Sequence, residues 1–155
     1  MAIVGSGTAG MALTAAGLRL DPLGSYNFNV EIEGVLVAGF TQVSGLEVTT
    51  DVFRYSEGGR NVGELTFAGK SKYTDITLTH GMTVSSSLYS WYMDVVNGKI
   101  QRKNATIYML SQLKVPVKWW NLYRALPVKW KGPTFDASQS AVAFEVLTLV
   151  HEGIT

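Results

Sequence analysis

The glycines near the start of the chain have the spacing most suggestive of chemistry. Gly5, Gly7 and Gly10 follow Ile3 and Val4 in the pattern G-x-G-x-x-G, which lets a backbone approach a pyrophosphate at the N-terminus of a helix. The strand before them would be very short, and no series of parallel βαβ units follows. We therefore favour a small-residue segment that packs closely or extends along a neighbour, and keep a dinucleotide-binding enzyme fragment as an alternative.

The two histidines could serve as general bases or as metal ligands. His151 and Glu152 resemble the start of the zinc motif H-E-x-x-H, but Thr155 stands where the second histidine would be needed. His80 and His151 each end a predicted strand, where we expect the imidazole to make a local hydrogen bond. The chain has no cysteines, which excludes disulfides and thiolate metal sites. We expect no catalytic residues, no metal and no cofactor.

A stretch rich in lysine and tryptophan, residues 114–131, resembles a platform for single-stranded nucleic acid, because rings that alternate with cations can stack on successive bases. The 13 basic and 12 acidic residues give a net charge of only +1, without the excess that non-specific binding needs. We place Trp119, Trp120 and Trp130 in the core or at a subunit contact, with the lysines facing solvent or a lumen. A single-strand binder is the second alternative.

The composition indicates a surface that lies against something else. Charged residues make up 16% of the chain and hydrophobic residues 46%, against about 25% charged in an average soluble domain. A surface short of charge is typical of an interface. No apolar run reaches the ~18 residues of a membrane span, so we expect a soluble chain without a membrane anchor. Residues 1–20 are rich in Gly and Ala, with no basic residue before Arg19, and we interpret them as an N-terminal extension, not a signal peptide.

Alternating apolar and polar residues predict the strands that carry these segments. Residues 26–33 alternate strictly, and Gly34 makes a turn. A polar loop at residues 56–63 should project. We interpret residues 122–135 as an irregular crossing or edge segment, because they contain Pro127 and a second proline. Further strands are predicted at residues 35–43, 46–55, 64–68, 74–80, 105–111, 115–120 and 141–151. In the last of these we expect Val142, Phe144, Val146, Thr148 and Val150 to form one face.

One helix is predicted between the strands. Its apolar stripe recurs at i, i+3, i+4, i+7 and i+8. Ser85 or Ser86 can cap its N-terminus, and Asn97 with Gly98 ends it. Together the elements predict one mainly-β domain over residues 21–155, an antiparallel β-sandwich or barrel with one flanking α-helix. The stripe consists of Leu88, Trp91, Tyr92, Val95 and Val96.

Several short phrases, taken in order, resemble one protein family. They include Asp21-Pro22, Phe28-x-Val30-x-Ile32-x-Gly34, Phe40-x-x-Val43-Ser44-Gly45-Leu46, Tyr55-x-Glu57-Gly58-Gly59, Leu78-x-His80-Gly81, Leu88-x-x-Trp91, Arg102-Lys103, Pro127-x-Lys129-Trp130, Gly132-Pro133 and Glu152-Gly153. Each phrase alone is weak, but their order over residues 21–155 is specific. The chain resembles the tail-tube proteins of contractile phages, which are shared with R-type bacteriocins and extracellular contractile injection systems and are akin to the haemolysin-coregulated tube protein of type VI secretion.

The resemblance implies a structural role without catalysis. Six-membered rings would stack into a hollow tube inside a contractile sheath and carry DNA or protein cargo. The partners would be further copies of the chain together with sheath, baseplate and terminator proteins. Assembly would take place in the bacterial cytoplasm, and the product would be part of a phage virion or of a released injection particle.

The resemblance also suggests which residues make contacts between rings. Residues 46–63 would form an arm that reaches the adjacent ring. His80 stands where a basic residue is common in the family, and residues 1–20 are longer than the expected leader. The arm candidates are Leu46, Val48, Asp51, Phe53, Tyr55, Glu57, Gly58, Gly59, Arg60 and Asn61. Lumen candidates, chosen because they lie in or beside predicted turns, are Lys70, Lys72, Lys99, Arg102 and Lys103.

Overall fold

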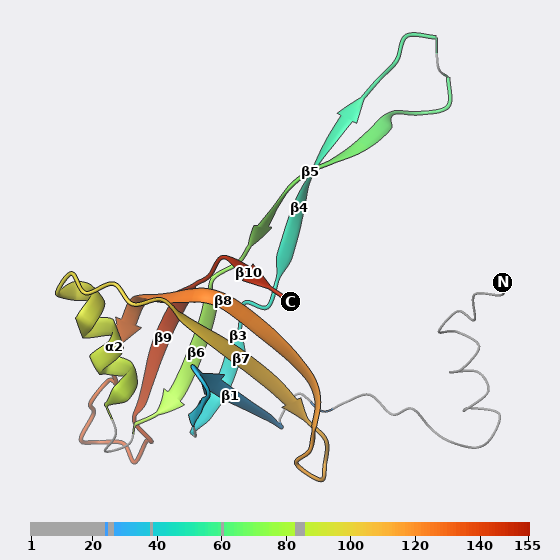
Figure 1. Cartoon of the computed structure of the whole chain (residues 1–155). Helices are drawn as coiled ribbons and strands as arrows, with labels where there is room; N and C mark the ends of the chain where they lie inside the picture. The colour runs from blue at the N-terminus through green and yellow to red at the C-terminus, as the bar shows by residue number, and fades with distance from the viewer. Residues whose placement is uncertain (1–23, 25–26, 38, 60, 83–85) are drawn as a thin grey trace, which may run out of the picture.

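A computed structural model describes residue 24 and residues 27–37, 39–59, 61–82 and 86–155 (Figure 1). The glycine motif at residues 5–10 and the predicted extension at residues 1–20 lie outside the described residues. The elements in chain order are β1 (Phe28–Ile32), β2 (Val35–Val37), β3 (Phe40–Ser44), β4 (Val48–Tyr55), β5 (Leu65–Tyr73), β6 (Ile76–Gly81), α2 (Ser87–Val96), β7 (Lys103–Leu110), β8 (Pro116–Lys131), β9 (Phe144–Val150) and β10 (Gly153–Ile154).

An antiparallel sheet of eight strands forms the body of the domain. The strand order is β2-β1-β7-β8-β9-β6-β3, and β10 also pairs with β8. The long strand β8 joins the two halves, because its first half pairs with β7 and its second half with β9. Arg124 has a φ of 50° within β8, where the strand leaves one half of the sheet for the other. The sheet thus wraps around a core, as predicted for a sandwich or barrel, and β2 and β3 are its edges.

The core lies inside the curved sheet and under the helix. Val30, Leu122 and Leu149 are fully buried, and burying each such side chain stabilises the fold by roughly 1.5–3 kcal/mol. Helix α2 adds Leu88 and Trp91 from its predicted apolar stripe, and the Trp91 indole donates to the Gln101 carbonyl at 2.9 Å. No helix among the described residues is long and apolar enough to cross a membrane.

The ends of the helix are as the sequence predicts. Ser86 precedes the first turn, and Asn97 follows the last. Gly98 has a φ of 86°, which glycine adopts readily and which ends the helix. The Ser86 side chain makes no capping hydrogen bond, so the position was predicted correctly but the cap bond is absent.

The prediction of one strand over residues 35–43 is wrong. Two strands form there, and they lie at opposite edges of the sheet, because β2 pairs with β1 and β3 pairs with β6. Gly39 separates them with a φ of 90°, and a Cβ at this position would lie 3.1 Å from Nε2 of His80. Residues 35–40 read as one short apolar run around Gly39, so the residue pattern alone does not reveal this crossing.

The irregular crossing predicted at residues 122–135 is also wrong over most of its length. Strand β8 continues to Lys131. Pro127 sits where the register against β9 shifts, between Pro127 and Lys129. A proline lacks the N–H that a regular ladder needs, but it is tolerated at such an irregularity.

The face predicted for the last strand is inverted. Leu147 and Leu149 are buried in β9, whereas Val146 and Val150 are only partly buried. Glu145 shares the buried face, because its carboxylate accepts hydrogen bonds there. A buried carboxylate makes the interior side of the strand look polar in the sequence.

Candidate assembly surfaces

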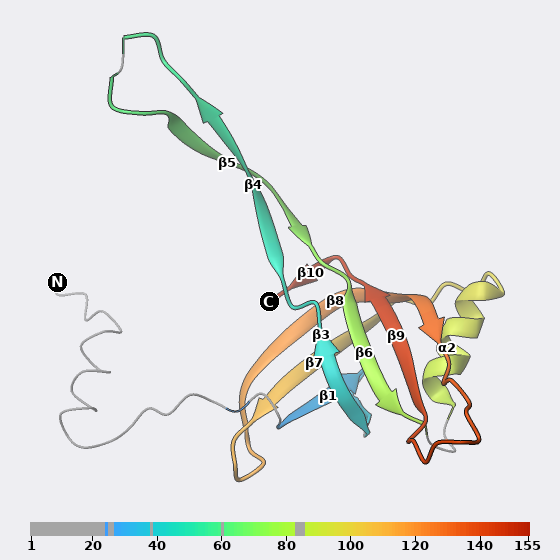
Figure 2. The same ribbon diagram turned by 180° about the vertical axis from the view of Figure 1, so that it is seen from behind.

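A two-stranded arm, β4 paired with β5, projects away from the domain (Figure 1, Figure 2). Val48 lies opposite Tyr73 at its base, and Tyr55 lies opposite Leu65 near its end. At 3.3 Å per residue, the eight residues of β4 span roughly 26 Å. An isolated hairpin is at best marginally stable in water. The arm therefore gains stability when it lies against a partner.

The root of the arm is held by a close backbone approach. Gly45 has a φ of 94°, and a Cβ there would lie 2.0 Å from the carbonyl oxygen of Asp75. The Thr74 amide donates to the Glu47 carbonyl at 3.2 Å. These contacts between the two strands fix the point at which the arm leaves the body.

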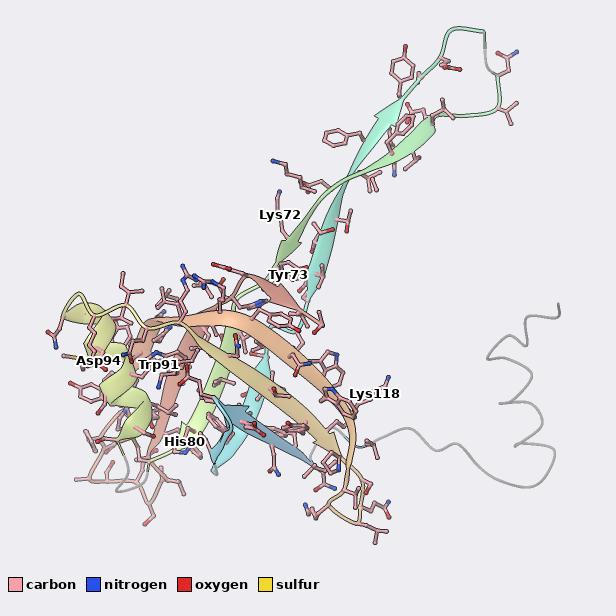
Figure 3. All side chains as sticks on the ribbon, in the orientation of Figure 1. Lys72, Tyr73, His80, Trp91, Asp94 and Lys118 are labelled. Atoms are coloured by element: carbon pink, nitrogen blue, oxygen red, sulfur yellow. The ribbon has the colours of Figure 1, made fainter. Side chains whose placement is uncertain are left out.

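Polar pairs cross the half of the arm nearest the body, outward from Val48 and Tyr73. The hydroxyls of Thr50 and Ser71 are hydrogen-bonded across the strands at 2.8 Å. Lys72 forms an ion pair with Asp51 at 2.9 Å, and Figure 3 shows Lys72 on the arm. Such exposed pairs contribute about 0–1 kcal/mol each.

The outer half of the arm is aromatic and exposed. Phe53 lies opposite Phe67, and the two residues are 62% and 55% exposed. Tyr55 is 59% exposed farther out. A Cβ on Gly69 would lie 2.5 Å from the Phe53 ring, so the absence of a side chain lets the ring lie across the arm. Exposed rings gathered in one place are typical of a contact surface.

The loop at the end of the arm is polar, as predicted. The Ser56 hydroxyl donates to the Glu64 carboxylate at 3.2 Å, which ties the two sides of the loop together. Val62 is exposed beside them. Of the ten arm candidates, Arg60 lies outside the described residues. Leu46 lies at the root, and the other eight lie on β4 or in the loop. Their contact with another ring remains a prediction.

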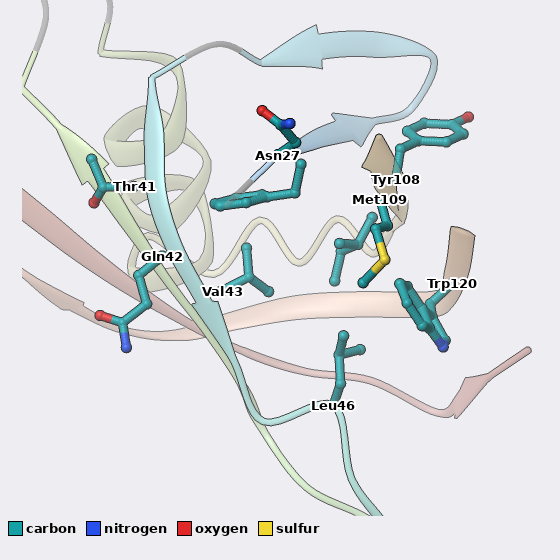
Figure 4. Close-up of a pocket in the computed structure, with 10 residues that line it drawn as sticks. Asn27, Thr41, Gln42, Val43, Leu46, Tyr108, Met109 and Trp120 are labelled. Carbon is teal, nitrogen blue, oxygen red and sulfur yellow. The ribbon is translucent and has the colours of Figure 1, made fainter. Parts of the chain in front are cut away.

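An apolar groove of about 290 Å³ lies in the body beside the arm root (Figure 4). It separates edge strand β3 from strands β1 and β7, which pair with each other but not with β3. Leu46 is 40% exposed at its mouth, whereas Ile107 is buried in its floor. The apolar lining is Phe28, Val43, Leu46, Ile107, Met109 and Trp120.

Polar groups line the margin of the groove. The Tyr108 hydroxyl donates to Glu31 at 3.1 Å, and this hydrogen bond, with desolvation and the nearby negative charge, raises the pKa of Tyr108. The Lys114 ammonium donates to the side-chain oxygen of Asn27. Lys118 lies opposite Met109 across β7 and β8. One end of the groove therefore has two lysines beside it.

The lumen candidates are not brought together. Lys70 and Lys72 lie on the arm, and Lys99 follows the helix. Arg102 forms an ion pair with Glu152 at 3.4 Å. Lys103 lies over the Trp91 ring and close to Glu33. Their placement at a lumen remains a prediction.

The histidines serve the fold. His80 is buried, and its Nδ1 lies 3.1 Å from Oε1 of Glu145. The other oxygen of Glu145 accepts from the Trp130 indole at 2.8 Å. His151 is hydrogen-bonded to the Thr74 carbonyl at 2.9 Å. Among the described residues no group of acidic, histidine or cysteine side chains could hold a metal ion.

Two of the three tryptophans in residues 114–131, Trp120 and Trp130, pack against the core. Trp119 is 56% exposed, and its place at a subunit contact remains a prediction. Sequence reasoning missed the groove, because its lining comes from four separate parts of the chain. The sequence signal for the groove was an apolar residue, Leu46, between the turn glycine Gly45 and β4.

A family model described as T4-like virus tail tube protein gp19 matches residues 24–155. The match extends over the body, the arm and the helix. The chain belongs to this family of tail tube proteins. It is a structural tube subunit, so the resemblance found in the sequence is confirmed, and no comparison supports either alternative.

Solved structures of tail tube proteins and their relatives share the fold. A chain in the cryo-EM structure of the anti-feeding prophage baseplate is 29% identical with a TM-score of 0.78, covering 88% of this chain and 96% of that one. A chain of the PVC sheath-tube complex, from an extracellular contractile injection system, is 26% identical with a TM-score of 0.76, covering 92% and 95%. Hcp1 from Flavobacterium johnsoniae shares the fold, at 17% identity and a TM-score of 0.52. The match covers 84% of this chain and 94% of Hcp1. Comparison with curated proteins found no match.

Proposed function

We propose that copies of this chain close into six-membered rings and that the rings stack into a hollow tube inside a contractile sheath. The anti-feeding prophage structure that the chain resembles is six-fold symmetrised, which supports the number six. The structure with 26% identity is a sheath-tube complex, which supports a surrounding sheath. Baseplate and terminator proteins would meet the two ends of the tube, since similar chains occur in such assemblies.

Ring closure would use the open edge of β2 against a different surface of the neighbouring copy. Strands β2 and β3 each pair on one side only within the described residues, but the open edge of β3 borders the apolar groove. An unpaired edge offers N–H and C=O groups to another chain. Two different surfaces on one subunit make a heterologous contact, and such a contact closes into a ring when the rotation fits.

Stacking of rings would use the arm. The projecting arm is the observation that carries the proposal. The arm extends beyond the body, and its exposed aromatic side chains are on the outer half. A partner at the far end of the arm would then belong to another layer of subunits. Six arms in each ring would repeat the contact and strengthen it through multivalency.

The tube would act as a conduit for DNA or protein cargo. Its work is mechanical, and we infer that the chain is not an enzyme. The particle would be assembled in the bacterial cytoplasm and would become part of a virion or of an extracellular injection device. The similar structures belong to an anti-feeding prophage and to an extracellular contractile injection system, which supports this location.

Negative-stain electron microscopy of the purified full chain tests the proposal. Hollow rings with six-fold class averages, alone or stacked into tubes, are the expected result. Particles that average as single compact domains under all conditions of concentration and salt would overturn it.

A further inference from the structure

The geometry points to a specific receiving site for the arm. We propose that the apolar groove of one copy binds the aromatic pair Phe53 and Phe67 from the arm of a copy in the adjacent ring. This inference rests on the proposed stacking of rings and adds the surface that receives the arm. The receiving residues are Phe28, Val43, Leu46, Ile107 and Met109, with Trp120 at one side.

The size and lining of the groove suit aromatic side chains. Its volume of about 290 Å³ is at the lower limit of the roughly 300–1,000 Å³ of small-molecule pockets. Figure 4 shows Val43, Leu46, Met109 and Trp120 around the hollow. An exposed ring that enters such an apolar pocket is the usual anchor of a protein interface. Phe53 and Phe67 are the anchors that the arm offers.

A groove and an arm of the same copy cannot meet. Leu46 lies at the mouth of the groove, and Phe53 follows it seven residues along the chain, an extended span of roughly 23 Å. The arm points away from the body (Figure 2). The phenyl ring that enters the groove must therefore come from the arm of a second copy. The contact is head-to-tail, because it joins two different surfaces. A head-to-tail contact whose rotation does not close repeats along an axis, as a growing tube requires.

Charged groups lie near both surfaces. Lys114 and Lys118 lie beside the Asn27 and Met109 end of the groove, and Glu31 and Glu47 also lie near it. The arm loop carries Glu57 and Glu64 next to its aromatic half, and the same arm carries Arg54 on β4 and Arg60 in the loop sequence. An arm that enters with Glu57 and Glu64 toward the two lysines pairs opposite charges at that end, which favours this direction.

Disulfide trapping tests the contact, because the chain has no cysteine of its own. The variant that combines Leu46→Cys with Phe53→Cys is assembled as the full chain and oxidised mildly. A disulfide needs Cα atoms within about 7 Å, so within one copy the two thiols cannot meet. The expected result is a ladder of covalent multimers on a non-reducing gel.

The matched control is Leu46→Cys combined with Val52→Cys. Val52 is 54% exposed and neighbours Phe53 on the opposite face of the arm. We expect at least roughly tenfold less multimer from it, since a disulfide tolerates little displacement. A third variant, Leu46→Cys with Phe67→Cys, repeats the test if replacement of Phe53 itself prevents stacking.

The outcomes separate this inference from the proposed function. Multimers from a Phe variant but not from the Val52 control support the groove. Tubes in the microscope with no multimers from either Phe variant overturn the groove alone. Equal multimers from all three variants also overturn it. A native chain that forms neither rings nor tubes overturns the proposed function, and the groove contact with it.

Discussion

Phe53 lies directly across the arm from Phe67, and both rings face solvent on a ribbon of only two strands. Neither ring has a place in the core of its own copy. Exposed aromatic pairs cost solubility unless another surface covers them. The pair is therefore the part of the arm on which assembly depends most.

Replacing both phenylalanines should prevent the stacking of subunit rings without affecting the folding of the subunit. The variant Phe53→Ala with Phe67→Ala should form rings but few or no tubes, because the anchors of the contact are gone. The melting temperature of the unstacked subunit should change little, since the two phenyl rings are not packed in the core. Electron microscopy and thermal denaturation measure the two effects. Val52→Ala is the control and should form tubes of normal length; loss of tubes in both variants would contradict the role of the aromatic face.

Removing the arm loop should have a related effect. Deletion of residues 56–62 shortens the arm without touching the body, so we expect a folded subunit that no longer stacks. Surface loops of this kind tolerate changes in length because they carry few buried contacts. Circular dichroism and electron microscopy on the same sample check the result. Tubes of normal length from this variant would show that the loop is dispensable.

The glycine at the arm root is predicted to be intolerant of a side chain. Gly45→Ala would place a Cβ 2.0 Å from the Asp75 carbonyl oxygen, at a positive φ of 94°. We expect a loss of more than about 1 kcal/mol in the free energy of unfolding, together with misdirected arms. Urea denaturation measures the first effect. Gly58→Ala, where a Cβ meets nothing within 4 Å, should be close to neutral, and equal losses from both would refute the backbone clash.

The buried carboxylate of Glu145 is predicted to stabilise the fold. Glu145→Ala removes the partner that His80 and the Trp130 indole share. Breaking a buried charged network costs about 3–5 kcal/mol. The loss in the free energy of unfolding should therefore far exceed that of Glu57→Ala on the exposed loop, which should be within about 0.5 kcal/mol. Urea denaturation of both variants decides. A Glu145 variant as stable as the native chain would contradict this role.

The sequence predicts the parts of the fold that depend on local pattern. The β1 alternation, the projecting loop and the helix with buried Leu88 and Trp91 are all where periodicity and turn residues place them. The arm strands were also predicted, although β5 runs on to Tyr73, past its predicted end. These features depend on neighbours in the chain, which a sequence displays directly.

The errors concern partners that are distant in the chain. Nothing near Gly39 indicates that the chain crosses from one edge of the sheet to the other, because residues 35–40 read as one short apolar run. Pro127 was expected to interrupt β8, but a register shift against β9 accommodates it. Glu145 made the interior face of β9 look polar, because its partners His80 and Trp130 lie in other strands. The groove was missed for the same reason.

Rings and tubes require copies of the chain to bind one another, and sedimentation velocity measures this self-association most directly. The purified native chain, run over a wide range of concentration and salt, should sediment as rings and larger stacked species. Their share should grow with concentration. A single species of 16.9 kDa under every condition would contradict the account, since the edges and the arm would then have no partner.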